Sequence, residues 1–259
     1  FRENEGEIAA VITEAAAGNM GTVAPRNDFN AKLKELAPEF DWDAYVSGLD
    51  APQGAFDELV VGEPSYLSGL SAALTEHDLD DWKAWLSWRL ISDQAPYLHE
   101  AMVDESFAFN GKVLSGTPKL KERWKRGVAV VESCLGEVVG QLYVAEHFPP
   151  RAKERMVGLV ANLIEAYRRD FETLEWMSPQ TRERALAKLA RFVPKIGYPD
   201  KWRDYSDLEI VPGDLLGNLA RSADFEMRRQ LDRIGGPIDR TEWLMTPQTV
   251  NAYYQPMMN

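Results

Sequence analysis

Apolar residues recur every three or four positions through most of the chain, which is the spacing of one helix face. Polar stretches that contain proline or glycine separate these segments and mark where helices begin and end. The pattern therefore predicts a mainly α-helical protein built from multiple helices. The expected helices cover residues 1–17, 41–49, 64–74, 78–102, 117–147, 151–174, 178–192 and 214–234.

Two of these segments are expected to organise the core. The segment 117–147 would form a helix roughly 45 Å long at the usual rise per residue, and we expect it to be the spine of the domain. The segment 78–102 carries leucine and tryptophan over much of its circumference, which is typical of a helix buried between layers. Pro96 lies inside this second segment and is expected to kink or restart the helix.

Residues at the ends of these segments support the assignment. Asp41, Thr117 and Ser178 each precede a periodic segment as helix caps, and the last two are followed by proline at the first helical position. Glycine and proline at 235–237 end the last helical segment. We therefore predict a domain boundary there, with a helical lobe over residues 1–236 and a second, strand-containing unit that begins within residues 237–259.

The final stretch of the chain has a different period. Val250, Ala252 and Tyr254 alternate with Asn251 and Tyr253, which predicts a short strand over residues 249–254. Flanking prolines suit the edge of a sheet. An edge strand leaves backbone N–H and C=O groups to which an extended peptide can pair, and the Asn251 amide adds two donors and an acceptor. The pattern alone still favours an ordinary half-buried strand.

Composition and charge narrow the classes of function. The net charge is −12, which disfavours nucleic acid and anionic membranes as partners. No run of about eighteen apolar residues is found, so we expect no membrane segment. The chain has 1 cysteine, Cys134, so it cannot form an intrachain disulfide. The apolar residues around Cys134 favour a buried, unreactive thiol.

The chain has 3 histidines, and none of them completes a metal site. A zinc peptidase needs two imidazoles four positions apart on a helix, a third ligand and a general base. His99-Glu100 begins such a motif, but Val103 stands where the second imidazole is required. We therefore predict no catalytic residue and no metal ligand in this chain. His99 is expected on a helix face, His147 at a helix C-terminus and His77 at a helix start.

Short motifs along the chain resemble those of bacterial neprilysin-like (M13) zinc metallopeptidases. The similarity runs from about residue 40 to residue 259 and departs near residues 18–27, where members of that family carry a longer helical stretch. It ends on Val250-Asn251-Ala252-Tyr253-Tyr254, which is similar to the family's substrate-binding strand. The other motifs that carry the resemblance are residues 124–127, 147–150, 176–182, 187–189, 197–199 and 201–205.

The resemblance implies a fold, a site and a cofactor. A multi-helix lobe would close over a thermolysin-like catalytic domain, whose first edge strand lies within residues 237–259. Asn251 and Ala252 would hydrogen-bond the backbone of a peptide substrate, and Tyr253 and Tyr254 would shape the cleft. Zinc is expected for the full-length enzyme, held by a missing C-terminal catalytic half and not by this chain. The chain alone is therefore predicted to be inactive.

Two other functions remain open at this stage. One is a non-catalytic helical module that binds peptides or a partner protein, and the other is a helical scaffold without a ligand. The ordered series of motifs favours the peptidase over both. The low cysteine content indicates a bacterial relative, since animal members of the resembled family are rich in disulfides. For localisation we expect a soluble bacterial protein, either cytoplasmic or secreted.

Overall fold

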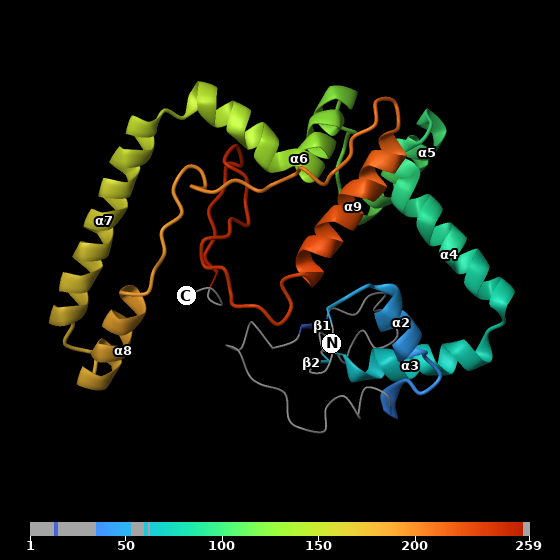
Figure 1. Ribbon diagram of the computed structural model, residues 1–259, viewed down its shortest axis with the longest axis horizontal. Coiled ribbons are helices and arrows are strands. Elements are labelled where there is room, and N and C mark those ends of the chain that lie inside the picture. The colour runs from blue at the N-terminus through green and yellow to red at the C-terminus, as the bar shows by residue number, and fades with distance from the viewer. Residues whose placement is uncertain (1–12, 15–34, 53–59, 62, 256–259) are drawn as a thin grey trace. The chain divides into compact units, whose positions relative to one another are not determined.

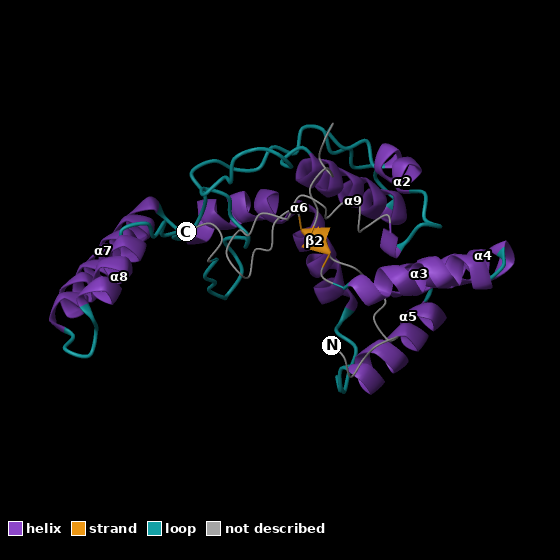
Figure 2. Ribbon diagram, turned by 90° about the horizontal axis from the view of Figure 1, so that it is seen from below, coloured by secondary structure: helices purple, strands orange, loops and turns teal. Residues whose placement is uncertain are grey.

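The computed structural model describes residues 13–14, 35–52, 60–61 and 63–255, and these are mainly helical (Figures 1 and 2). The chain divides into two compact units, of which the first contains Phe1–Glu122 and Leu208–Gly236 and the second Arg123–Asp207 and Pro237–Asn259. The prediction of a mainly α-helical protein is confirmed. Of the helix expected over residues 1–17 only Thr13–Glu14 is described, and it is a strand, so the prediction is wrong there.

The first unit combines helices with one small strand pair. Strands β1 (Thr13–Glu14) and β2 (Val60–Val61) are antiparallel, with Thr13 opposite Val61. A small core forms around Ala37 and Leu67, against which Phe40, Trp42 and Tyr66 pack. The helical elements are α2 (Trp42–Gly48), α3 (Pro64–Glu76), α4 (Leu79–Gln94), the 3₁₀ turn η3 (Ala95–Tyr97), α5 (Glu100–Ser106), the π-helix η4 (Phe107–Leu114) and α9 (Leu215–Leu231).

The second unit contains three long helices and two irregular segments. The helices are α6 (Arg123–His147), α7 (Pro150–Thr173) and α8 (Pro179–Leu189), and α7 and α8 lie side by side (Figures 1 and 2). Residues 190–207 and 237–255 contain no helix or strand. The second of these segments carries the four residues that the sequence analysis selected for substrate binding, Asn251, Ala252, Tyr253 and Tyr254.

Several predicted helix starts are confirmed by their caps. The Asp41 carboxylate accepts the N–H of Ala44 at 2.9 Å, and the Ser178 hydroxyl accepts the N–H of Thr181 at 3.2 Å. Pro64 begins α3 as predicted. The long segment 78–102 is divided at Pro96, which lies in the 3₁₀ turn η3 between α4 and α5. Side-chain chemistry within a few residues was sufficient to predict these ends.

The expected 45 Å spine is wrong in two respects. α6 begins at Arg123, and residues 117–122 are not helical. The N–H of Thr117 donates to the carbonyl of Gly111 at 2.8 Å, so the backbone at this position completes the end of η4 and does not begin a new helix. α6 also departs from helical geometry at Leu135, where φ is −131° and ψ is 30°, and it therefore consists of two halves joined at a kink.

Burial of α4 between layers is also not observed. No residue of α4 is buried among the described residues, and Trp85 is 45 % and Leu90 64 % exposed. The breadth of an apolar stripe indicates which faces of a helix favour burial. It does not indicate whether another segment of the chain packs against those faces. Cys134 is also less buried than expected, because it is half-buried where a buried thiol was predicted.

α6 qualifies the expectation that the chain has no membrane segment. By length and composition alone, this helix is apolar enough to cross a bilayer. Core helices of water-soluble proteins meet the same criterion. Glu132 and Glu137 of α6 form hydrogen bonds with residues 203, 246 and 248 of the same unit, which is the behaviour of a helix packed against protein. Length and composition therefore do not assign a membrane span here.

Candidate functional site

An open groove with a volume of about 840 Å³ lies within the second unit. Its walls come from α7, from α8 and the residues that follow it, and from residues 240–255. Most of the lining is apolar, and several aromatic rings contribute to it. We call it the α7–α8 groove. Its defining residues are Leu163, Tyr167 and Phe171 of α7, Lys188 and Leu189 of α8, Phe192, Lys195, Arg240, Trp243, and Asn251, Ala252, Tyr253 and Tyr254.

The structure brings all four predicted substrate-binding residues to this groove. Asn251 and Ala252 are exposed, and the Asn251 Oδ1 accepts the N–H of Ala252 at 2.8 Å. The N–H of Asn251 donates to the carbonyl of Thr249 at 3.0 Å. No hydrogen bond from another described residue reaches the carbonyl of Asn251 or of Ala252. These backbone acceptors are therefore available to a ligand.

The predicted strand over residues 249–254 is not present in the structure. Residues 250–255 have no regular secondary structure. A strand is defined by hydrogen bonds to a neighbouring strand, and among the described residues no such neighbour lies beside this segment. The alternating sequence pattern therefore predicts only that successive side chains of this segment point to opposite sides. Whether the segment forms a strand depends on a second backbone segment with which it can pair.

The two tyrosines are held at the groove by different contacts. The ring of Tyr254 stacks on Phe192, with centroids 5.6 Å apart and planes inclined by 17°. The ammonium group of Lys188 lies 5.4 Å from the centre of the same ring, within the range of a cation–π contact. The hydroxyl of Tyr253 accepts the N–H of Leu244 at 3.4 Å. Tyr254 therefore packs against the end of α8, and Tyr253 folds back on its own segment.

Positive charge borders the apolar lining. Burial lowers the pKa of Lys195, and the carboxylates of Glu242 and Asp239 oppose this effect. The guanidinium of Arg240 donates to the carbonyl of Arg191 at 2.6 Å. Together with Lys188, these groups add cations to a groove whose walls are otherwise largely apolar. A largely apolar surface with a few charged groups is typical of a binding site.

None of the three histidines is among the residues that line this groove. His99 is the N-cap residue of α5, which corrects the expectation that it lies on a helix face, and Val103 on the next turn is buried. His147 ends α6 as predicted, and His77 follows the end of α3, 3.6 Å from Asp81. Among the described residues no group of three or more His, Cys, Asp or Glu is arranged to hold a metal. The side chains described here do not fit a zinc site.

Sequence reasoning missed the residues that hold the segment before Asn251. Thr246 and Gln248 both bind Glu132 of α6, and the same segment packs on Gly136 and Gly140. The hydrogen bonds between this segment and α6 join residues that are 112 to 116 positions apart in the sequence. No local sequence pattern predicts such pairs. The spacing of two glycines by four positions on a helix was the one available signal of a close approach.

Fold and groove define a mainly helical protein with a surface suited to binding. Comparison with known families gives the next step. Residues 19–199 match the family described as peptidase family M13, and the chain belongs to this family. The resemblance recognised in the sequence is thereby confirmed.

Relatives and solved structures agree with this assignment. The chain is 31 % identical over 205 residues to a neutral endopeptidase of Lactobacillus helveticus, covering 78 % of this chain and 32 % of the relative. It is 28 % identical to human neprilysin over 78 % of this chain and 28 % of the relative. A zinc metalloprotease of Mycobacterium tuberculosis in its open state is 46 % identical, with a TM-score of 0.78 over 95 % of this chain and 38 % of that one. The chain thus spans about a third of the length of these proteins.

Proposed function

We propose that this chain is the helical lobe and the peptide-binding segment of a zinc metalloendopeptidase that cleaves oligopeptides. Relatives named as a neutral endopeptidase and as a zinc metalloprotease support the reaction class. The chain corresponds to about a third of their length, so the zinc ligands are assigned to polypeptide that these residues do not include. The lobe boundary is proposed at residues 236–237, with residues 237–259 belonging to the catalytic domain.

One observation carries the binding role. The exposed residues Asn251 and Ala252 line the α7–α8 groove, and their backbone carbonyls accept no hydrogen bond from the described residues. An extended peptide can hydrogen-bond to such a backbone in the manner of an added strand. The Asn251 amide has donors and an acceptor within reach of the same peptide backbone, and Tyr253 and Tyr254 form the neighbouring wall.

The proposal is tested by replacing Asn251→Ala in the zinc-loaded polypeptide that carries this chain. Each hydrogen bond to a neutral group contributes about 1 kcal/mol, and about 1.4 kcal/mol corresponds to tenfold in affinity. Loss of one to two bonds to the peptide should therefore lower kcat/KM for an oligopeptide roughly tenfold. Val250→Ala is the matched control, because Val250 is fully exposed and does not line the groove. An unchanged kcat/KM for Asn251→Ala would contradict the assigned role.

Inactivity of the chain by itself is a separate expectation. The described side chains offer no zinc cluster and no nucleophile–base pair at the groove, so the cleavage chemistry is assigned to the catalytic half. Intact mass and zinc content of the same purified sample decide this point. A mass of 29.3 kDa without zinc, together with peptide hydrolysis, would overturn the proposal. The same mass with peptide binding and no hydrolysis would favour the non-catalytic binding module.

A further inference from the structure

The segment that precedes Asn251 is bound to α6 by the carboxylate of Glu132 and by a backbone carbonyl. Glu132 accepts a hydrogen bond from the Thr246 hydroxyl and another, at 2.6 Å, from the Nε2 of Gln248. The same Nε2 donates to the carbonyl of Gly136 at 2.9 Å. Both partners of the Nε2 only accept hydrogen bonds, which agrees with the nitrogen lying beside Glu132 and the Gly136 carbonyl. The Oε1 of the same amide lies beside Gly140 of α6.

Two glycines allow this close approach. Gly136 and Gly140 lie one turn apart on α6 and are buried. A Cβ atom at Gly136 would lie 2.7 Å from the Cγ2 of Thr246, and one at Gly140 would lie 2.9 Å from the Cδ of Pro247. Both distances are shorter than carbon atoms tolerate, so any larger residue would displace the segment from the helix.

A tight turn carries this attachment toward the groove. The N–H of Thr249 donates to the carbonyl of Thr246 at 3.1 Å, and the two threonine hydroxyls are 2.7 Å apart. Asn251 follows two residues later, and its own N–H is bound to the carbonyl of Thr249. An unbroken series of hydrogen bonds therefore leads from Glu132 to the residue that the proposed function assigns to the peptide.

We propose that Glu132, Gly136 and Gly140 form an anchoring site that sets the position of the peptide-binding segment. They are positioning residues, since they lie outside the lining of the α7–α8 groove and act through residues 246–249. The inference rests on the proposed function and deepens it. It assigns substrate affinity in part to a helix that contacts no substrate.

The first test compares two glycine substitutions on the same helix. Gly140→Ala would introduce the contact with Pro247, whereas Gly127→Ala meets nothing within 4 Å and is exposed. Hydrogen exchange on the zinc-loaded polypeptide that carries this chain should show amides of residues 246–252 exchanging about tenfold faster in Gly140→Ala and unchanged in Gly127→Ala. Amides of α8 should be unaffected in both, which separates local release from general unfolding.

The second test removes the hydrogen bonds without adding bulk. Glu132→Ala should release the same amides, and Glu132→Gln should have an intermediate effect because its amide retains one acceptor oxygen. With an oligopeptide substrate, Gly140→Ala and Glu132→Ala should raise KM several-fold and leave kcat nearly unchanged, because a loosened segment weakens binding of the ground state and the transition state alike. A purely structural defect would lower the amount of active enzyme and leave KM unchanged.

The outcomes separate this inference from the proposed function. Faster exchange confined to residues 246–252 together with a raised KM supports the anchoring site. Exchange that is unchanged in both Gly140→Ala and Glu132→Ala overturns it. Faster exchange with an unchanged KM overturns the link between the anchor and the substrate. In that case a raised KM for Asn251→Ala would leave the proposed function intact, and an unchanged one would remove both.

Discussion

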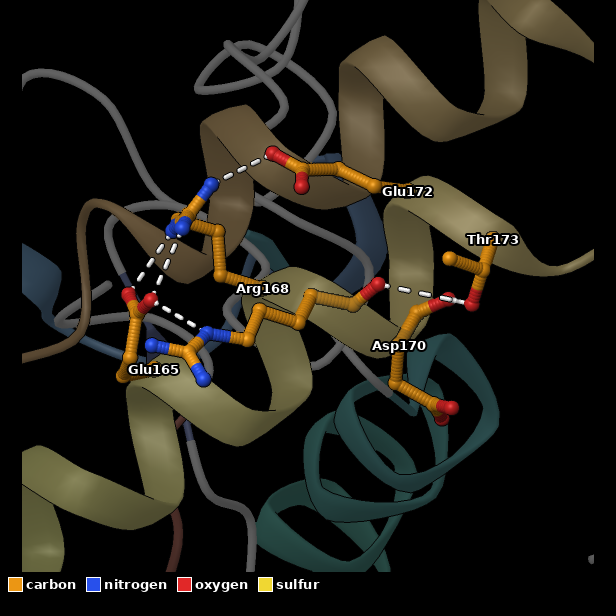
Figure 3. A network of polar contacts seen from close by, with 6 residues as sticks. Glu165, Arg168, Asp170, Glu172 and Thr173 are labelled. Carbon is orange, nitrogen blue, oxygen red and sulfur yellow. Dashed lines mark hydrogen bonds and ion pairs between the residues drawn. The ribbon is translucent and has the colours of Figure 1, made fainter.

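The two longest helices of the second unit are held by contacts of different kinds. In α6, Glu137 accepts the backbone N–H of Arg203 at 2.7 Å, and Glu132 binds residues of the final segment, so both carboxylates reach across the unit. In α7, Arg168 lies between Glu165 and Glu172 on its own helix (Figure 3). One helix is tied to distant parts of the chain, and the other is largely tied to itself.

Contacts with distant residues fix the position of a helix in the tertiary structure. Contacts within one helix only stabilise its helical conformation. The ion pairs that Arg168 and Arg169 form within α7 are three or four positions apart and exposed, where water and salt weaken them. The carboxylate of Glu137 is largely buried, so its hydrogen bond to the backbone has no replacement from solvent. Substitutions in α6 should therefore disturb the tertiary structure, whereas those in the charged face of α7 should change little.

The largest effect is expected from Glu137→Ala. It leaves the N–H of Arg203 without its acceptor and removes an ion pair with the Nε of Arg203 at 3.8 Å. An unsatisfied buried donor costs about 1 to 3 kcal/mol, so the free energy of unfolding from urea titration should fall by that amount. Glu137→Gln retains an acceptor and should lose less. A loss as small as that of an exposed ion pair would remove the distinction between the two helices.

An intermediate effect is expected at Lys153, where α7 also reaches across the unit. The ammonium group of Lys153 donates to the carbonyl of Tyr198 at 2.8 Å and to Asp200 at 2.7 Å, and it lies 4.1 Å from the centre of the Tyr198 ring. Lys153→Met keeps the aliphatic chain and loses these contacts, so the free energy of unfolding should fall by about 1 kcal/mol. Lys153→Arg tests whether charge alone is sufficient. Equal stability of all three proteins would contradict a tether here.

The smallest effect is expected from Glu165→Gln. Hydrogen bonds from Arg168 and Arg169 lower the pKa of Glu165 from 4.5 to about 2. A carboxyl group whose pKa is lower in the folded state stabilises fully above its unfolded pKa, and this contribution is lost as the pH falls through the folded pKa. The melting temperatures of the wild type and of Glu165→Gln should therefore differ slightly at pH 7 and converge between pH 4.5 and about 2.

High salt should reduce the same difference, because it screens exposed charges. Glu154→Gln on the same helix is the matched control, because Glu154 is exposed and takes no part in the ion pairs of Arg168 and Arg169. A difference between wild type and Glu165→Gln that grows toward pH 2 would have the wrong sign for a carboxylate bound by arginine.

Sequence reasoning succeeded where a few neighbouring residues determine the structure. Asp41 and Ser178 were recognised as caps because each binds an N–H three positions away. It failed at Thr117, whose backbone completes a preceding π-helix, and at α4, whose apolar stripe did not reveal what covers it. The order of the motifs predicted the family. The four residues chosen from the last motif, residues 251–254, all line one groove.

The anchor on α6 lay beyond the reach of such reasoning. Glu132 resembles any other glutamate of an acidic chain until the fold brings residues 246 and 248 beside it. The groove itself is assembled from α7, from α8 with the residues that follow it, and from residues 240–255, which are far apart in the sequence. Pairings across more than a hundred positions depend on packing that periodicity does not encode.

The lone thiol offers a way to observe α6 close to the anchoring site. Cys134 is the single cysteine of the sequence, half-buried two residues after Glu132 and next to Leu135, where α6 bends. A thiol-reactive fluorophore or spin label would therefore attach at one place in these 259 residues without any prior mutagenesis. By the helical repeat, positions 132 and 134 point to opposite sides of α6, so the emission or line shape of the label would report the geometry of the helix at its bend.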